Sequence, residues 1–484
     1  MIRSLLLASV LIAAPALLVP ADAQRIRPNP APVAQPSTAP LTLDEVLRSS
    51  ARAAPQIVEA LAKVRAAEGR AITAAGAFDT VFEAEGRSRA LGYYDGTVAS
   101  AGVTRPLNDN GGYLYGDYRV SRGDFPVYED KNYTNRLGEV KVGALYALLR
   151  DRLIDERRTK RTLAAGDIDI AQFEREAVAI GVQRRAIDAY QNWVAAGLRL
   201  RAYRDLLELS ESRRGGLARQ VELGARPDIL LTENDQNLVR RRALVVRAEG
   251  DFQAAANALS LYYRDMAGQP VLVGAERLPG NGEALAGVAA VARANFEQKR
   301  PDLQMLLARI DQGSARLALA QNDQKPRLDL RGEMAKDIGP VGLGGPNRTP
   351  LEAAVGFRFS LPLQNRAAKG RVVEARAEMD ALEARSRFLR DQITVEVEGI
   401  SIGVGAAEQL ATIAEQERQL AERLAAAERR RFELGSSDFF LVNQREETAN
   451  DARVRVIDAQ ARIAAARAEL AAATADRVAL GLEP

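Results

Sequence analysis

The chain has 484 residues and a formal net charge of +3, from 67 Lys and Arg against 64 Asp and Glu. It contains no Cys and no His, which excludes disulfides, thiolate metal sites and a lipid anchor on Cys, and removes the commonest general base. Charges of both signs are mixed along the chain rather than gathered in blocks, which argues against nucleic acid as a partner. We therefore expect neither an enzyme nor a bound cofactor or metal.

The N-terminus has the three parts of a secretory signal: Arg3, an apolar run over Leu5–Val19, and the small-residue pattern Ala21-Asp22-Ala23. The apolar run is shorter than the ~20 residues that span a bilayer, so a cleaved signal over residues 1–23 is favoured over a membrane anchor. Residues 24–40 carry several prolines and are expected to form an extended linker.

The remaining sequence is duplicated. Pro55–Gly86 matches Pro301–Gly332 at a constant offset, and Glu222-Leu223-Gly224 is answered by Glu433-Leu434-Gly435. Each copy has the same order: helix, strand, loop, strand, very long helix, tight turn, helix. This predicts a pseudo-symmetric protomer, whose domains we place at residues 41–262 and 285–484, joined by a linker at 263–284.

The first predicted helix begins at a capping box made by Thr42 and Glu45 and runs to about Ala75. Two far longer helices are predicted, at about Arg152–Leu223 and Arg366–Leu434, each on the order of 100 Å long at 1.5 Å per residue.

Each long helix ends at a Leu-Gly turn and is followed by a returning Ala-rich helix, to about Tyr262 in the first copy and Leu480 in the second. The small residues permit close packing of helices, so two antiparallel hairpins around a tube are expected. The runs Arg240–Arg242 and Arg429–Arg431 within these helices are expected to be solvated or to form inter-helix ion pairs.

Strands are predicted where apolar and polar residues alternate with a period of two. One begins at Phe78; two clearer ones contain Leu328–Met334 and Val355–Leu361; the repeat places a fourth at about Gly138–Ala147. The intervening segment 92–137 is longer than its counterpart and contains residues that could form an extra hairpin, and the sequence leaves open whether that hairpin joins the sheet.

Such alternation is typical of a sheet on a soluble core or of a membrane barrel wall with water inside. The secretory signal, strands of about ten residues and charges of both signs on one face favour the barrel. The side chains expected to line its lumen are Asp329, Arg331, Glu333 and Arg358. A later apolar run long enough for a membrane helix is absent from the sequence.

The helix turns have a capping chemistry that also suits an exposed docking surface. Gly224 and Gly435 occupy the position where a helix ends in a left-handed residue, and Asp228 and Asp438 stand at the positive ends of the returning helices.

The chain resembles the TolC family of outer-membrane efflux channels over nearly all of its mature length. The resemblance rests on the duplication, on Leu41–Leu47 and Arg300–Leu303 opening the two copies, on Phe357–Leu363 at the crossing from strand to helix, and on the Leu-Gly turns.

The resemblance implies a mainly α fold with a small β part. Duplicated helical hairpins would form an α-barrel in the periplasm, and four strands per protomer would enter a twelve-stranded transmembrane β-barrel in a homotrimer. It further implies an outer-membrane channel of a tripartite efflux or type I secretion system, a passive export duct that works with a periplasmic adaptor protein and an inner-membrane pump. The alternative is a periplasmic or surface coiled-coil spacer capped by a small sheet.

By position, the resemblance assigns the adaptor-facing turns to six residues: Glu222, Leu223, Gly224, Glu433, Leu434 and Gly435. Well-known members close the tip with acidic residues in the second returning helix, where this chain has Leu441 and Gln444. Asp228 and Asp438 are therefore the candidates for a tip constriction.

Overall fold

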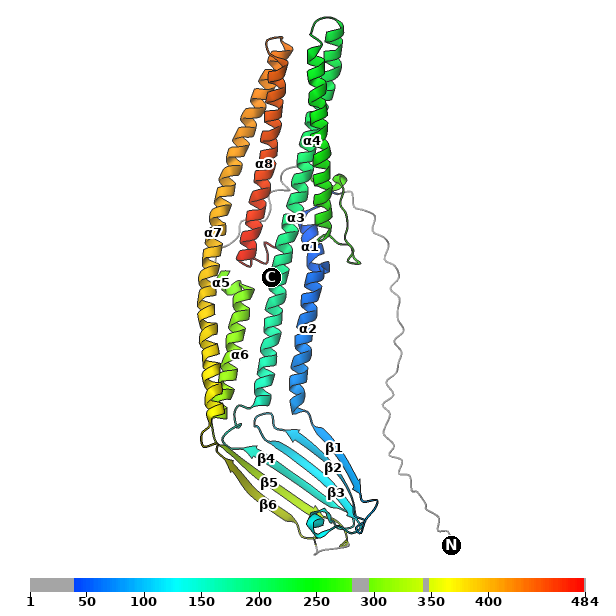
Figure 1. Cartoon of the computed structure of the whole chain (residues 1–484), viewed down its shortest axis with the longest axis vertical. Coiled ribbons are helices and arrows are strands. Elements are labelled where there is room, and N and C mark those ends of the chain that lie inside the picture. The colour runs from blue at the N-terminus through cyan, green and yellow to red at the C-terminus, as the bar shows by residue number, and fades with distance from the viewer. Residues whose placement is uncertain (1–38, 281–295, 343–347, 483–484) are drawn as a thin grey trace, which may run out of the picture. The chain divides into compact units, whose positions relative to one another are not determined.

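The computed structural model describes residues 39–280, 296–342 and 348–482, so the expected signal sequence and most of the linker lie outside the described residues. Pro40–Pro484 forms one compact unit. Its main helices fall into two matching series (Figure 1). The first series is α2 (Pro55–Ala75), α3 (Glu156–Glu222) and α4 (Ile229–Ser260), and the second is α6 (Pro301–Asp323), α7 (Arg366–Glu433) and α8 (Phe439–Ala473).

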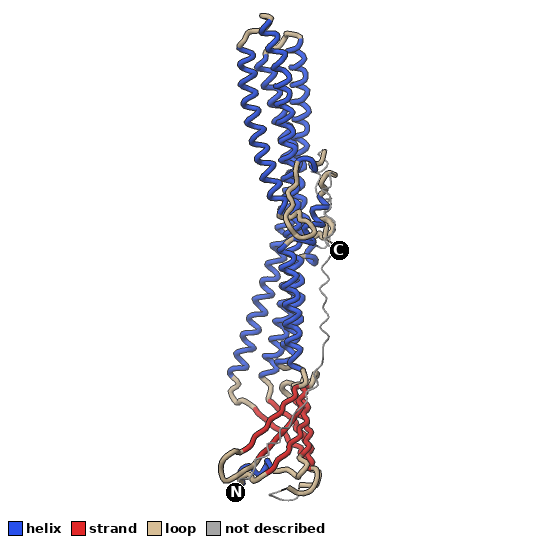
Figure 2. Tube along the Cα trace, turned by 90° about the vertical axis from the view of Figure 1, so that its right-hand side faces the viewer, coloured by secondary structure: helices blue, strands red, loops and turns tan. Residues whose placement is uncertain are grey.

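The two long helices are continuous, with 67 residues in α3 and 68 in α7, as the sequence predicts. They run from the sheet to the far turns, while α2 and α6 lie beside their sheet-proximal halves and α4 and α8 beside their distal halves (Figures 1 and 2). α3 also contacts α6 and α8 of the second series. The sheet-proximal half and the distal half of the helical part therefore contain four helices each, and the two long helices α3 and α7 run through both halves.

The first predicted helix is two helices, α1 (Leu43–Ala53) and α2. Pro55 explains the break, because its ring disfavours helical geometry at the preceding residue, and Ala54 is extended with ψ of 124°. Only half of the predicted capping box forms. Thr42 Oγ1 accepts from the Glu45 backbone N–H at 3.2 Å, whereas the Glu45 carboxylate pairs with Arg277 at 2.8 Å.

The main apolar core lies near the middle of the helical part, where α1 and the segments that follow α4 and α8 wrap the long helix α3. Its centre is Trp193, which is fully buried and packs against Tyr190 and Phe252 with ring centroids 6.0 and 6.1 Å away. The returning helix α8 ends seven residues before the predicted Leu480, at Ala473, and the chain turns at Ala475, whose φ is 50°. Leu480 is then free to fold back into this core.

All six strands form one antiparallel sheet, with neighbours in chain order. They are β1 (Val81–Ser88), β2 (Thr97–Pro106), β3 (Tyr113–Arg122), β4 (Glu139–Ala147), β5 (Arg327–Asp337) and β6 (Glu352–Ser360). The predicted count of four strands is too low. The insert at 92–137 contains β2 and β3, which join the sheet between the two strands that the repeat predicts.

Four short helices complete the described elements: η1 (Gly76–Phe78), η2 (Val127–Asn132), η3 (Ala275–Arg277) and α5 (Phe296–Lys299). In the part of the chain that the structure describes, each helix lacks either the length or the apolar character needed to cross a membrane.

Candidate functional surfaces

The two distal turns have the same hydrogen-bond geometry. In the first, the Gly224 and Ala225 N–H groups donate to the Val221 and Gln220 carbonyls at 2.9 and 2.8 Å. In the second, Gly435 and Ser436 donate to Phe432 and Arg431 at 3.0 and 2.9 Å. This is the Schellman motif, in which a left-handed residue closes the helix, and Gly224 and Gly435 have φ of 71° and 76°.

The six predicted tip residues all lie on these turns and are exposed. Leu223 and Leu434 stand out because each is 78% exposed although apolar. Arg226 lies 5.0 Å from the centre of the Phe432 ring, so a cation–π contact joins the two turns within one protomer.

The two candidate constriction residues lie in unequal environments. The Asp438 carboxylate caps α8 by accepting from the Phe440 N–H at 3.3 Å, whereas the Asp228 side chain makes no capping bond and its backbone is already helical. Both side chains are exposed within the protomer.

An ionic cluster with two buried side chains at its centre joins all four distal helices a few turns from the tips. We call it the four-helix node: Arg213 of α3, Arg241 of α4, Arg429 of α7 and Glu446 of α8. Arg213 donates to Glu446 Oε1, Arg429 Nε lies 3.3 Å from the same oxygen, and Arg241 Nη2 lies 3.7 Å from Oε2. The Arg241 and Glu446 side chains are each only 1% exposed.

Burial lowers the pKa of Arg241, and the Glu446 and Glu447 carboxylates oppose that shift. The Arg241 guanidinium also donates to the Leu206 carbonyl at 3.2 Å and to Ser210 Oγ. The node therefore fixes one helical hairpin to the other through a carboxylate that three guanidinium groups share.

Sequence reasoning treated Arg240–Arg242 as a uniform run. In the structure, Arg240 and Arg242 are exposed and pair with Glu447 and with Glu211, whereas Arg241 is buried. The signal was available in the spacing. The buried residues of α4 recur at intervals of four and three, and Arg241 occupies one of those positions: Asn234, Leu238, Arg241, Val245, Ala248 and Phe252.

The sheet has one polar face and one apolar face, and the strand register defines them. The four residues predicted to line a lumen all lie on the polar face. Asp329 stands opposite Arg358 on the neighbouring strand and is paired with Arg327 at 2.7 Å. Opposite charges at directly facing positions stabilise adjacent strands.

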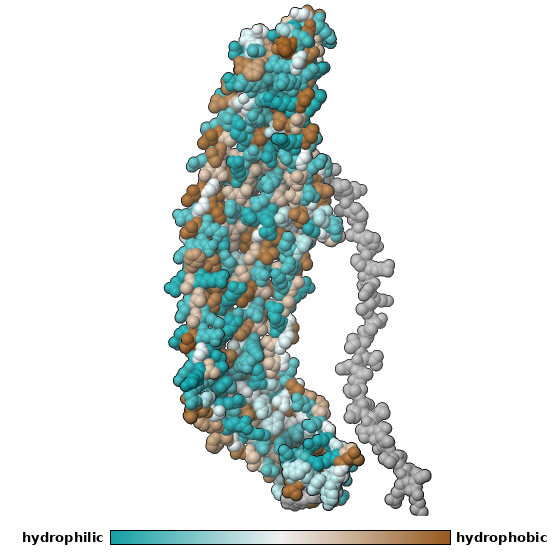
Figure 3. All heavy atoms as spheres, viewed as in Figure 1, coloured by the Kyte–Doolittle hydropathy of each residue, from teal (hydrophilic) through white to brown (hydrophobic). Residues whose placement is uncertain are grey.

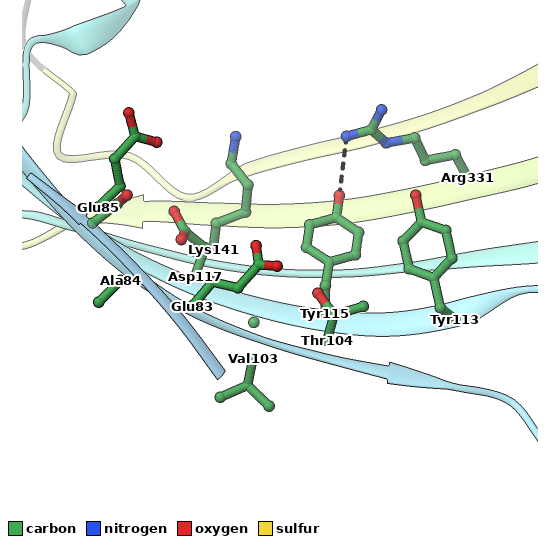
Figure 4. Close-up of a pocket in the computed structure, with 13 residues that line it drawn as sticks. Glu83, Ala84, Glu85, Val103, Thr104, Tyr113, Tyr115, Asp117, Lys141 and Arg331 are labelled. Carbon is green, nitrogen blue, oxygen red and sulfur yellow. Dashed lines mark hydrogen bonds between the residues drawn. The ribbon is translucent and has the colours of Figure 1, made fainter. Parts of the chain in front are cut away.

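Residues from both sequence repeats and from the insert meet on that polar face. Arg331 Nη2 donates to Glu333 at 2.9 Å. It also donates to the Tyr115 hydroxyl at 3.2 Å (Figure 4). Tyr115 in turn donates to Glu333 at 2.7 Å. Figure 4 shows Asp117 and Lys141 on the same side and Val103 on the opposite side of the sheet.

The opposite face is apolar across the whole width of the sheet. One row of cross-strand partners runs through one residue of each strand: Phe82, Val103, Gly116, Val142, Met334 and Ala353. This face is uncovered in the protomer, with Phe82 68% and Phe357 79% exposed. An exposed apolar surface that spans six strands requires a lipid or protein partner.

A protein-family model described as outer membrane efflux protein matches residues 293–476. No curated protein matches the chain.

Solved structures match across the fold at low identity. The outer membrane channel CmeC of Campylobacter jejuni is 13% identical, with a TM-score of 0.60 over 91% of this chain and 90% of that one. The outer membrane protein VceC of Vibrio cholerae is 16% identical, with a TM-score of 0.60 over 89% and 95%. The open state of the MtrE outer membrane channel of Neisseria gonorrhoeae is 15% identical, with a TM-score of 0.62 over 91% and 89%.

These matches confirm the predicted mainly α fold with a small β part, and the family model that matches describes a channel protein rather than an enzyme. In the residues that the structure describes, no group of Asp and Glu side chains is arranged to hold a metal ion. Residues 293–476 thus match the outer membrane efflux protein model, and the chain has the fold of these solved outer membrane channels.

Proposed function

We propose that this chain is the outer-membrane channel of a tripartite efflux or type I secretion system, a passive duct that a homotrimer forms across the outer membrane and periplasm. The observation that carries the proposal is the two-faced sheet, mainly apolar on one side and, on the other, carrying charged side chains from five of its six strands. Lipid outside and water inside require that arrangement.

The sheet edges support assembly from several copies. Every residue of β1 and β6 is exposed, and the outer edge of each strand has no partner strand among the residues that the structure describes. Unpaired backbone groups are not tolerated in hydrocarbon, so the two edges must meet the edges of other copies.

The helical part offers a matching surface. Apolar side chains recur at seven-residue spacing along the outer side of α7, at Phe388, Val395 and Ile402, and again at Ile413 and Leu420, and all five are exposed. Figure 3 shows brown side chains recurring along the edge of the molecule where α7 lies. Heptad spacing is the pattern of a helix packed against another helix, and a second copy of this chain is the occupant that we propose.

The distal turns are proposed to dock the periplasmic adaptor protein through Leu223 and Leu434, with an inner-membrane pump supplying energy beyond it. The two leucines are equally exposed and the two turns have the same hydrogen-bond geometry, so each protomer offers the adaptor two similar apolar contact points. Solutes would pass along the charged faces of the strands, including Asp329, Arg331 and Glu333, once the tips separate.

Membrane partition and mass together test the proposal. The full-length protein should resist extraction by carbonate, and in detergent its mass should be that of three chains. A protein that carbonate releases and that is monodisperse without detergent would be the coiled-coil spacer instead.

The tip assignment has its own test in planar bilayers. We expect Asp228→Ala with Asp438→Ala to raise basal single-channel conductance, because a ring of carboxylates at a constriction would be removed. Asp438→Asn separates the loss of charge from the loss of the helix cap, since an Asn side chain retains the capping acceptor of α8 and removes only the charge. Unchanged currents in the double variant would exclude these residues from the constriction.

A further inference from the structure

We propose that the β2–β3 hairpin is a membrane-spanning insertion into the first repeat, and that the assembled barrel has eighteen strands rather than the twelve that the family resemblance implies. The inference rests on the proposed trimer. With six strands in each protomer's sheet, three protomers supply eighteen.

The hairpin replaces a direct contact between the two strands that the repeat predicts. In the second repeat β5 pairs directly with β6, whereas in the first repeat β2 and β3 stand between β1 and β4. Both inserted strands pair along their whole length, Thr97–Pro106 with Tyr113–Arg122, and each also pairs with its outer neighbour. The hairpin is therefore an integral part of the sheet.

The turn of the hairpin is built into the base of the helical part. The buried Asn110 side chain bonds the backbone of Ala147, at the end of β4, in both directions at 2.8 and 2.9 Å. Arg158, in the first turn of α3, donates to the Asp109 carbonyl at 2.7 Å. A Cβ on Gly112 would lie 1.8 Å from the Leu145 carbonyl oxygen, so only Gly fits there. These contacts fix the hairpin in the plane of its neighbours.

The inserted strands have the length of membrane strands, and their two faces continue those of the neighbouring strands. Each has 10 residues, within the ~9–11 that cross a bilayer when tilted. Val103 and Tyr118 lie on the apolar face, and Thr104 and Asp117 on the polar face, continuous with the same faces of β1 and β4. A hairpin outside the membrane would have no need of an exposed apolar face.

The strand count also permits closure. Since neighbouring strands are antiparallel and each protomer has six, β6 of one copy meets β1 of the next in the antiparallel sense. A single inserted strand would have broken that sense, and an inserted pair preserves it.

The predicted consequence is a wider pore through the membrane. With strands ~4.8 Å apart and tilted by ~40°, a twelve-stranded barrel is about 24 Å across between backbones and an eighteen-stranded one about 36 Å. The cross-section therefore rises more than twofold, about 2.25-fold. The barrel would then be a weaker barrier to large solutes than the helical tips.

Electron cryo-microscopy of the full-length protein in detergent gives the direct test, with eighteen strands around a trimer as the expected result. A trimer with twelve strands and the hairpin outside the wall would overturn the inference and leave the proposed function intact. Particles that are not trimeric would overturn the proposed function itself.

Cysteine labelling tests the hairpin independently, because the native chain has no Cys. In reconstituted vesicles a water-soluble maleimide should label Thr104→Cys, on the polar face, and should not label the adjacent Val103→Cys. Lys141→Cys and Val142→Cys on β4 form the matched control pair on a strand that the repeat predicts. Equal labelling at positions 103 and 104 would place the hairpin outside lipid.

A deletion variant supplies the structural counterpart. Thr97 and Arg122 face each other, and the Gly96 N–H donates to the Asp124 carbonyl at 2.9 Å, so residues 97–122 can be removed by joining 96 to 123. The shortened protein should form a trimer with twelve strands and a lumen about two thirds as wide. An unchanged barrel width in the shortened trimer would refute the insertion of the hairpin into the wall.

Discussion

The four-helix node gives the sharpest test of how the two distal hairpins are joined. Replacing Glu446 by Gln keeps the side-chain volume and removes the charge that Arg213, Arg241 and Arg429 share. Arg241 is 1% exposed, and it would be left as a buried cation whose remaining counter-charge is Glu447, 4.0 Å away and already paired with Arg240. Breaking a buried pair by removing one partner costs about 3–5 kcal/mol.

That cost should appear as local opening of the distal helices. A loss of about 3 kcal/mol corresponds to an increase of more than a hundredfold in the opening equilibrium, because about 1.4 kcal/mol changes it tenfold. Hydrogen exchange of peptides around residues 241 and 446, measured on the protein in detergent, should accelerate accordingly. Exchange in the strands β1 to β6 should not change, since the node lies in the distal half of the helices.

Glu249→Gln is the matched control. Its pair with Arg204 spans α3 and α4 at 2.6 Å, but the side chains are 53% and 41% exposed, so we expect at most about 1 kcal/mol. Combining Arg241→Met with Glu446→Leu should recover much of the loss, because an apolar pair no longer buries charge. If Glu446→Gln exchanges no faster than Glu249→Gln, the node does not hold the hairpins together and the reasoning from burial is wrong.

Three further outcomes follow from local geometry. Gly435→Val should destabilise the second tip by about 1–2 kcal/mol, since φ at this residue is 76°, and Gly435→Asn should destabilise it less. Proteolysis at the tip should therefore be faster in Gly435→Val than in Gly435→Asn, and the reverse order would contradict the argument. Gly112→Ala should abolish correct assembly of the sheet, which the yield of trimer would report. Gly216→Ala should instead stabilise α3 by about 0.5–1 kcal/mol, because no atom of the protomer lies within 4 Å of the added Cβ, and a higher melting temperature would report it. Hydrogen bonds from Arg418 and Gln419 lower the pKa of Glu415 to about 2, so the contribution of this carboxylate to stability is present at neutral pH and is lost as pH falls from about 4.3 towards 2. The difference in melting temperature between the native protein and Glu415→Gln should therefore shrink over that pH range. A difference that stays constant would contradict the lowered pKa.

The sequence was sufficient for the elements with strong periodicity. The very long helices, the Leu-Gly turns and strands β5 and β6 follow from spacing, because apolar residues at helical or alternating intervals leave few other structures. Strand β2 was not predicted, since its Ala, Ser and Gly residues give little contrast between faces, and only pairing with β1 and β3 defines them. The break at Ala54 follows from Pro55, which disfavours helical geometry at the residue before it.

The candidate surfaces were predictable to unequal degrees. The tip residues follow from local capping rules, and the four charges of the polar face follow from alternation. The four-helix node depends on which helices become neighbours, and the sequence of a single helix does not contain that information. Arg241 could have been marked as buried from its heptad position, whereas its partner Glu446 lies 205 residues further along the chain and is found only from the arrangement of the four distal helices in space.

The uncovered apolar stripe of α7 and the two open sheet edges have a consequence for biogenesis. In the proposed trimer these surfaces are covered by other copies, so the final folding steps of a protomer would belong to assembly rather than to the single chain. Refolding should then accelerate with protein concentration. An excess of variant chains with a charged residue in place of Val395 should inhibit the assembly of native chains. In the proposed assembly, each newly exported chain therefore has to be kept from unrelated proteins until it meets other copies of itself.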